Sequence, residues 1–159
     1  MKKIKLYLDT SVMSHLDAPD TPEKMADTIA LWEEIKAGKY DIVISELTIE
    51  EIAHCFEPKR TFLNNELSKI ETILVTRTKD ISELAKSYVK NGVLSQKSYD
   101  DCMHIAYAVI ENCDFLVSWN FKHLVNVNTI KGVKIVNAIN DYREISIISP
   151  NMLISREEE

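Results

Sequence analysis

Three acidic residues, Asp9, Glu51 and Asp101, lie at positions from which carboxylates could bind a metal ion, since each is expected near a strand end or a helix start. Mg²⁺ and Mn²⁺ prefer oxygen ligands, and an ion held by carboxylates can polarise a phosphoryl oxygen and lower the pKa of a bound water. Without a cation, acids held that close would raise one another's pKa. The spacing alone leaves this chemistry open.

A structural role competes with the metal role for the first two acids. Asp9 follows an alternating apolar run at residues 4–8, and it could cap a short helix. Thr48 and Glu51 match a capping box, in which the glutamate reaches back to the backbone N–H of the cap residue. On a helical wheel, Glu50 and Glu51 flank the apolar face from opposite sides. Periodicity therefore does not choose between them.

The helical pattern that contains Asp101 separates it from its neighbour Asp100. One side of this pattern is apolar and consists of Cys102, Ile105, Ala106, Val109, Ile110 and Cys113. Asp101 borders that side, whereas Asp100 is expected to point into solvent. Ser98 and Asp101 also resemble a capping box with Asp in place of Glu. His104 shares a face with Asp101, and taken alone it is typical of a packing or surface histidine.

Strand-like and helix-like patterns alternate along the chain. The expected strands are 4–8, 41–44, 114–117 and 133–136, with further possible strands near 70–75 and at 146–148. The expected helices are 21–38, 48–56, 59–71, 81–91 and 99–112. Thr21 is the expected cap of the first of these, with Pro22 at its first position. This alternation predicts an α/β fold with a mostly parallel sheet.

Polar residues follow three of the expected strands. Asp9 ends the first, Ser45 ends the second, and Ser118 and Asn120 follow the strand at 114–117. In open parallel sheets, ligands bind beyond the carboxyl ends of the strands, where the strand order reverses. We therefore expect any functional site at this edge of the sheet.

Length and composition indicate a single soluble domain. The 159 residues support one domain, taken as 1–150, with an acidic tail at 151–159 that we expect to be flexible. No apolar run approaches the ~20 residues that a membrane-spanning helix needs, and a secretory signal is not expected. Three unpaired-looking cysteines, Cys55, Cys102 and Cys113, indicate a reducing compartment, so we expect a cytoplasmic protein.

The net charge of −6 argues against a large surface for sequence-independent DNA binding. It does not argue against a nuclease, because a site rich in carboxylates is itself acidic and divalent cations offset its charge. Other catalytic patterns are missing from the sequence. There is no glycine-rich phosphate loop, no zinc-site spacing and no nucleophile elbow.

Four segments in order resemble the signatures of PIN-domain proteins. These segments are residues 8–12 (LDTSV), 44–52 (ISELTIEEI), 101–108 (DCMHIAYA) and 116–120 (LVSWN). The resemblance spans nearly the whole chain, from residue 4 to residue 136. It implies a three-layer α/β/α fold and Mg²⁺- or Mn²⁺-dependent cleavage of RNA. It also implies the toxin half of a toxin–antitoxin pair, with an antitoxin protein as partner and frequently a homodimer.

The resemblance also assigns the site residues by position. Asp9 would be the first acid, Glu51 the second and Asp101 the third, and the pattern favours Glu51 where the helical wheel left Glu50 open. All three would act as catalytic residues and metal ligands.

One position departs from the family pattern. A fourth acid usually follows the last motif, and here that position is Asn120, whose carbonyl oxygen could still be a metal ligand. Ser11 matches a small hydroxyl residue that often lies beside the first acid, and Ser118 is a second candidate auxiliary residue. Asn120 leaves a second metal position, and full activity, open.

Two other classes of function compete with a ribonuclease. The first is a PIN-like protein that binds RNA or a partner and has weakened or lost nuclease activity. Asn120 favours it, whereas the presence of all three acids opposes it. The second is phosphotransfer through Asp9, as in receiver-like or dehalogenase-like domains. It ranks last, because Ser11 stands where a dehalogenase-like domain has a second Asp and no acidic pair precedes the strand.

Overall fold

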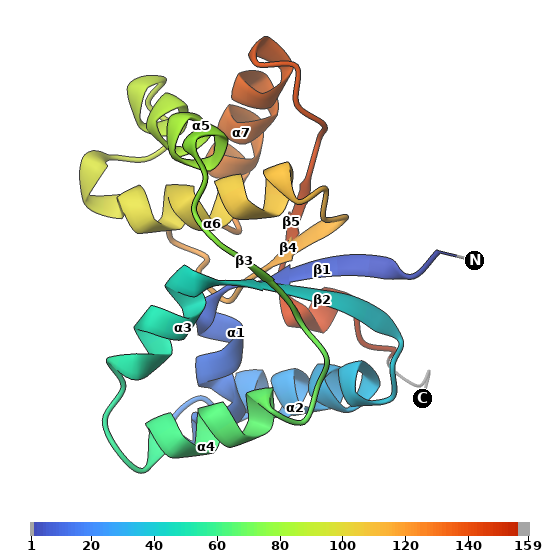
Figure 1. Cartoon of the computed structure of the whole chain (residues 1–159). Coiled ribbons are helices and arrows are strands. Elements are labelled where there is room, and N and C mark those ends of the chain that lie inside the picture. Colours follow the sequence, from blue (N-terminus) through green and yellow to red (C-terminus); the bar gives the residue numbers. More distant parts are fainter. Residues whose placement is uncertain (1, 156–159) are drawn as a thin grey trace.

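The computed structural model describes residues 2–155, which form a central parallel sheet between two layers of helices (Figure 1). The strands are β1 (Ile4–Leu8), β2 (Tyr40–Ser45), β3 (Ile73–Val75), β4 (Phe115–Val117) and β5 (Ser146–Ile148). Their spatial order is β3-β2-β1-β4-β5, and all four neighbouring pairs are parallel. The expected α/β fold with a parallel sheet is confirmed.

Seven α-helices connect these strands within the described residues. They are α1 (Thr10–Ser14), α2 (Pro22–Lys36), α3 (Glu46–Ala53), α4 (Lys59–Leu67), α5 (Lys79–Lys90), α6 (Tyr99–Ile110) and α7 (Val127–Ile139). Pro22 occupies the first turn of α2 as expected, although the Thr21 side chain makes no cap hydrogen bond. None of these helices is long and apolar enough to cross a membrane.

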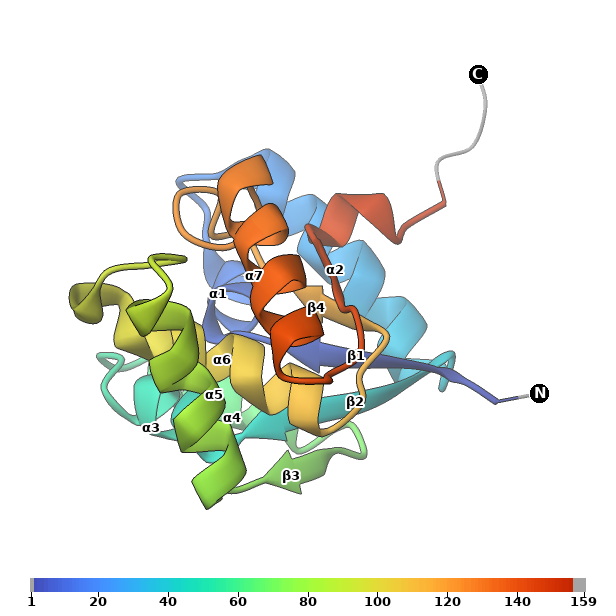
Figure 2. The ribbon, with the colours of Figure 1, turned by 90° about the horizontal axis from the view of Figure 1, so that it is seen from above.

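Alternation along the strands divides the buried side chains into two cores. Tyr7 points from β1 into one core, which it shares with residues of α5, α6 and α7, whereas Leu6 and Leu8 point into the other, beside α1, α2 and α4. Figures 1 and 2 show α5, α6 and α7 together on one face of the sheet, while α1, α2 and α4 lie on the opposite face. The fold is therefore the three-layer α/β/α arrangement that the resemblance implied.

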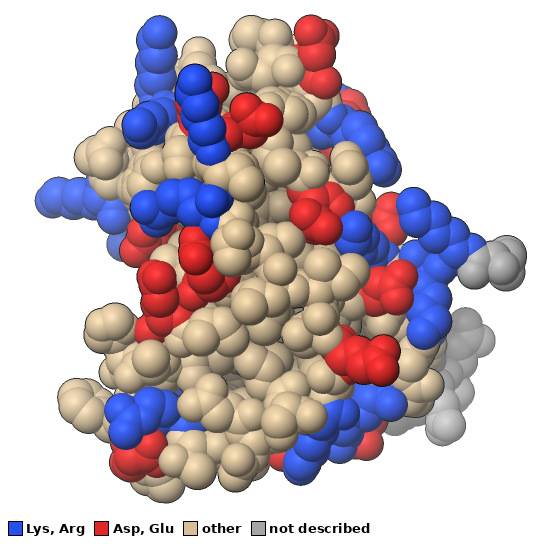
Figure 3. Space-filling view, in the orientation of Figure 1, with Lys and Arg blue, Asp and Glu red and all other residues tan. Residues whose placement is uncertain are grey.

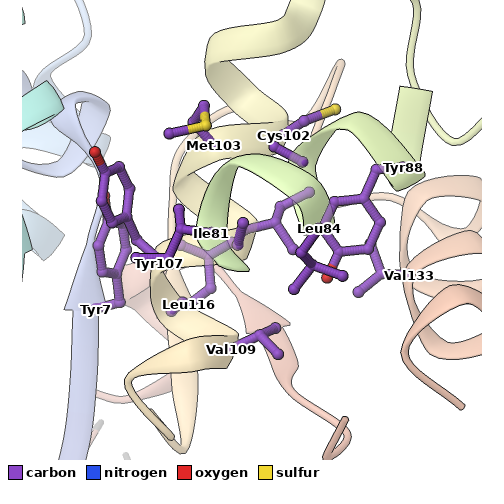
Figure 4. Close-up of a cluster of buried hydrophobic side chains, with 14 of the residues drawn as sticks. Tyr7, Ile81, Leu84, Tyr88, Cys102, Met103, Tyr107, Val109, Leu116 and Val133 are labelled. Atoms are coloured by element: carbon purple, nitrogen blue, oxygen red, sulfur yellow. The ribbon is translucent and has the colours of Figure 1, made fainter. Parts of the chain in front are cut away.

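The first core connects β1 to α6, which carries the third acid. The Tyr7 and Tyr107 rings stack with their centroids 6.4 Å apart and their planes at 8° (Figure 4). Around them α5, α6 and α7 bury Leu84, Met103 and Val133. Each fully buried side chain of this size contributes about 1.5–3 kcal/mol relative to an exposed one, so α6 is held firmly over the sheet.

The strand expected at 133–136 is wrong, because these residues belong to α7. The β-branched residues in this region are typical of a strand. However, the Asn126 side chain caps a helix at the Thr129 N–H, and Val133, Val136 and Asn137 are buried at helical spacing. Tertiary packing thus overrides the local propensity, and β5 at Ser146–Ile148 is the strand beside β4.

The residues after β5 pack against the core beside α1, α2 and α4, beyond the end expected for the domain. A 3₁₀ turn covers Pro150–Met152, and Leu153 and Ile154 lie partly buried against the core. Residues 153 and 154 of the expected tail thus contact the core, and the flexibility of the tail stays a prediction. Residues 156–159 lie outside the described residues.

Candidate active site at the carboxyl edge of the sheet

The candidate site lies where the strand order reverses. β1 is the first strand of the chain, and it pairs with β2 on one side and β4 on the other. The carboxyl ends of these strands lead into Asp9, Ser45 and Ser118. This is the position at which open α/β sheets bind ligands, and it is the edge that the sequence predicted.

Asp9 is buried and hydrogen bonded through both carboxylate oxygens. Oδ1 accepts from the Val12 N–H at 3.2 Å and from the Ser11 hydroxyl at 2.6 Å, and Oδ2 accepts from the Ser118 hydroxyl. Asp9 is thus the N-cap of α1, the structural role that its position allowed. Burial raises the pKa of Asp9, while the charge of His104 and these hydrogen bonds partly oppose that rise.

Glu51 projects from α3 towards α6. Ser45, at the end of β2, caps α3, since its hydroxyl accepts from the Thr48 N–H. The capping box expected between Thr48 and Glu51 is therefore wrong, because the helix begins earlier than the pattern suggested. This leaves Glu51 Oε1 to accept from Thr10 Oγ1 at 3.0 Å and from His104 Nε2 at 2.7 Å. Glu50 is exposed on the same helix.

His104 joins the acids at the centre of the site. Its side chain is 3% exposed, and its Nδ1 lies 2.6 Å from the Tyr7 hydroxyl. Burial alone would lower the pKa of His104. The hydrogen bond to Glu51 and the charges of Asp9, Glu51 and Asp101 outweigh burial and raise that pKa above 6.5. Of the three acids, Glu51 is the one with which His104 makes a direct contact among the described residues.

The pKa of Glu51 shifts in the complementary direction. Burial raises it, but the hydrogen bond and the charge of His104 are stronger, and the net pKa lies below 4.5. When His104 is protonated, its ring and the Glu51 carboxylate therefore form an ion pair between α6 and α3.

Asp101 faces the segment that follows β4. Its Oδ2 lies 2.9 Å from His123 Nδ1, and its Oδ1 lies 3.5 Å from Asn120 Nδ2. Ser98 makes no side-chain cap bond at the start of α6, so the expected capping box between Ser98 and Asp101 is wrong. Asp100 is exposed, as the helical wheel predicted.

Two serines attach the segment after β4 to the first acid. The Ser11 and Ser118 hydroxyls both donate to Asp9 and lie 3.3 Å from each other. Ser11 Oγ accepts from the Trp119 N–H and Ser118 Oγ from the Asn120 N–H. The two auxiliary residues thus place Asn120 beside the acids.

The donor set matches a hard divalent cation in chemistry. Asp9, Glu51 and Asp101 offer carboxylate oxygens and Asn120 an amide oxygen, the ligand types that Mg²⁺ and Mn²⁺ prefer. In the arrangement of residues 2–155, no three Asp, Glu, His or Cys side chains approach closely enough to form a metal-binding group. The acids are instead bonded to hydroxyl and imidazole groups, which an ion would have to displace.

The surface in this region is acidic with basic neighbours. Figure 3 shows Asp and Glu side chains gathered between the two helical layers, with Lys and Arg side chains above and below them. This acidic charge opposes the approach of a phosphodiester, and a bound cation would offset it.

Sequence comparison identifies the family. The PIN domain family model matches residues 5–122, which include all three acids and Asn120. The chain belongs to the PIN-domain family. No curated protein matches its sequence.

The fold of this PIN domain is similar to that of a chain in a solved complex. The complex is VapBC2 from Rickettsia felis bound to a DNA fragment from its promoter. The two chains share 15% identity with a TM-score of 0.56, and the match covers 92% of this PIN domain and 98% of the other chain.

Sequence reasoning missed three partners of the acids. Thr10, His104 and His123 each bond to Glu51 or Asp101, but only the fold brings them there. One indication for His104 was present in the sequence, because the helical pattern places it on the same face as Asp101. Its contact with Glu51 spans 53 positions and could not be read from spacing.

Proposed function

We propose that this PIN domain is an endoribonuclease that uses Mg²⁺ or Mn²⁺, with Asp9, Glu51 and Asp101 as its catalytic acids and metal ligands. One observation supports the proposal: the three carboxylates come from the end of β1, from α3 and from α6, and each is hydrogen bonded to polar partners at the carboxyl edge of the sheet. Membership of a family whose members are generally metal-dependent nucleases supports it.

A bound cation would supply polarisation of a phosphoryl oxygen and a lowered pKa for an attacking water. The residues of the chain would prepare its place. Asp9 is fixed by the Ser11 and Ser118 hydroxyls, and Glu51 is held by the His104 Nε2–H. Asn120, beside Asp101, would contribute a neutral oxygen in place of a fourth carboxylate.

The test is cleavage of RNA by the whole chain. Single-stranded RNAs of varied sequence are incubated with Mn²⁺, with Mg²⁺ or with EDTA. We expect internal cleavage with either metal and none with EDTA. Glu51→Gln should abolish cleavage, while Glu50→Gln, an exposed neighbour on α3, should retain it. Equal activity of the two variants would contradict the assignment of the second acid.

A second candidate function is a PIN domain that binds RNA or a partner with little nuclease activity. It is favoured by Asn120 and by the hydroxyl and imidazole groups that engage the acids. Retained RNA binding without cleavage, at Mn²⁺ in excess, would support this second function.

We further propose a cytoplasmic toxin that pairs with an antitoxin and forms a homodimer. The fold shared with a chain of the VapBC2 complex supports a partner protein. The three free cysteines support a reducing compartment. Gel filtration of the chain tests the homodimer. Co-expression with the product of an adjacent small gene, followed by gel filtration and activity assays, tests the antitoxin. Inhibition of cleavage by that product is the expected result.

A further inference from the structure

An exposed aromatic ring lies directly after the candidate site. The Phe121 side chain is 45% exposed, and it packs edge-on against Trp119, with the centroids 6.0 Å apart and the planes at 79°. Trp119 itself is buried, and its Nε1–H donates to Thr28 Oγ1 at 2.8 Å. His15 contacts the same indole from α1's end at 5.8 Å. Phe121 is therefore an exposed ring on a rigid support.

A lysine from another element covers the two rings. Lys24, in the first turns of α2, places its ammonium 5.1 Å from the Phe121 centroid and 5.7 Å from the Trp119 centroid. No ion pair found within residues 2–155 involves Lys24. A cation–π contact at an exposed site is weak, so an anion could draw this ammonium away from the rings. We call Lys24, Trp119 and Phe121 the aromatic shelf.

The aromatic shelf is attached to the acids through the backbone. The Trp119 N–H donates to Ser11 Oγ at 2.8 Å, and Ser11 in turn donates to Asp9. Asn120, between the two aromatic residues, bonds to Asp101. The shelf therefore includes the segment that bonds to Ser11 through Trp119 and to Asp101 through Asn120, which places it beside the candidate site.

We propose that the aromatic shelf is a binding subsite for single-stranded RNA, in which a nucleobase stacks on Phe121 and Lys24 binds a phosphate beside it. The inference rests on the proposed function, for which it names the form of the substrate. Stacking accepts any base, because every base has a π face, and an adjacent cation follows the backbone. Unpaired nucleotides alone can present a base in this way.

The net charge favours a subsite of this kind. At −6, the chain as a whole gains little from long-range attraction to RNA. Contacts that gain little from overall charge, such as base stacking, must then supply much of the affinity. The shelf also explains why a nearly buried tryptophan and an exposed phenylalanine flank the fourth-acid position.

Binding is measured by fluorescence anisotropy of a labelled 12-nucleotide single-stranded RNA, chosen as a probe of mixed sequence. The protein is the full chain carrying Glu51→Gln, which keeps the RNA intact. On this background Phe121→Ala should weaken binding about tenfold, since stacking is worth roughly 5- to 150-fold per base. Phe121→Trp should bind like the parent. Phe62→Ala, which removes a ring of similar exposure on α4, is the matched control and should change nothing.

The contribution of Lys24 is tested separately, through the salt dependence of RNA binding. Lys24→Met should weaken binding and reduce the slope of log affinity against log salt by about one, whereas Lys24→Arg should preserve both. An unchanged slope in Lys24→Met would remove the phosphate contact from the proposal. A duplex of the same RNA should bind more weakly than the single strand.

The outcomes separate this subsite from the nuclease activity. If the native chain cleaves RNA and Phe121→Ala binds and cleaves RNA equally well, the subsite is overturned and the proposed nuclease activity is supported. If RNA binds through Phe121 and is never cleaved, the subsite stands and the nuclease is overturned. If no RNA binds at all, both proposals fail.

Discussion

Glu51 and His104 form a hydrogen-bonded ion pair between α3 and α6, with Oε1 2.7 Å from Nε2. The other ring nitrogen of His104 is held by the Tyr7 hydroxyl, so the imidazole has a fixed orientation. In the protonated ring both nitrogens donate, one to the carboxylate and one to the phenol oxygen. The position of the second acid therefore depends on a residue of the helix that carries the third.

Removal of this imidazole should destabilise the protein. His104→Ala removes the shorter hydrogen bond of the Glu51 carboxylate and one hydrogen bond of the Tyr7 hydroxyl. We therefore expect a loss of about 1–3 kcal/mol in the free energy of unfolding. Urea denaturation followed by circular dichroism measures it. His54→Ala is the control, because His54 is exposed and its ring bonds to the Glu50 carbonyl. Its cost should stay within about 0.5 kcal/mol. Equal losses in the two variants would show that the pair adds nothing.

The same pair should make stability depend on pH in a defined direction. The pKa of His104 is raised above 6.5 in the folded protein, so its contribution is complete below pH 6.5 and is lost as pH rises through the folded pKa. The pKa of Glu51 is lowered below 4.5, so its contribution is present above pH 4.5 and is lost as pH falls through the folded pKa. The pair should therefore stabilise most between about pH 4.5 and 6.5.

The measurement is the melting temperature of the native chain minus that of His104→Gln, from pH 4 to pH 9. We expect the difference to peak in this window and to fall on the alkaline side. Proton NMR of the His104 ring should give a pKa above 6.5 in the native chain and a lower one in Glu51→Gln. A His104 pKa unaffected by Glu51→Gln would contradict the ion pair.

Substitution of two adjacent aspartates of α6 should have very different effects on RNA cleavage. Asp101→Asn should abolish RNA cleavage, because Asp101 faces Asn120 and His123 in the site. Asp100→Asn should keep most of it, because Asp100 is exposed. Cleavage rates of both variants at equal concentration and at unchanged melting temperature give the comparison. Similar losses would mean that Asp101 acts only through general electrostatics.

The sequence predicted the elements that bury apolar side chains and missed the contacts between them. The strands at 4–8 and 114–117 and the border position of Asp101 followed from periodicity, because burial imposes it. The strand expected at 133–136 was wrong because the β-branched Val133, Ile135 and Val136 favour a strand locally, and packing against α5 and α6 selects a helix. The ring of His104 meets Glu51 and Tyr7 across 53 and 97 positions, and no local pattern encodes such distances.

The last prediction concerns Asn120, a neutral amide at the position where the resemblance to the family leads us to expect a fourth acid. Its Oδ1 accepts from the His123 N–H at 2.9 Å, and its Nδ2 lies 3.5 Å from Asp101 Oδ1. In Asn120→Asp the carboxylate can still accept from His123, but it brings a second negative charge to Asp101 and loses the amide donor. Without a cation these like charges repel, so the variant should melt at a lower temperature than the native chain in EDTA.

Addition of Mn²⁺ should reverse that order. A cation between two carboxylates is attracted more strongly than one beside a carboxylate and an amide, so Asn120→Asp should need less metal for half-maximal cleavage. Its melting temperature should also rise more at a given Mn²⁺ concentration, because an ion that binds the folded state more tightly stabilises it more. Asn140→Asp, at the exposed end of α7, is the control and should shift neither quantity. An unchanged cleavage midpoint together with an unchanged Mn²⁺-dependent melting shift in Asn120→Asp would mean that Asn120 does not face the ion.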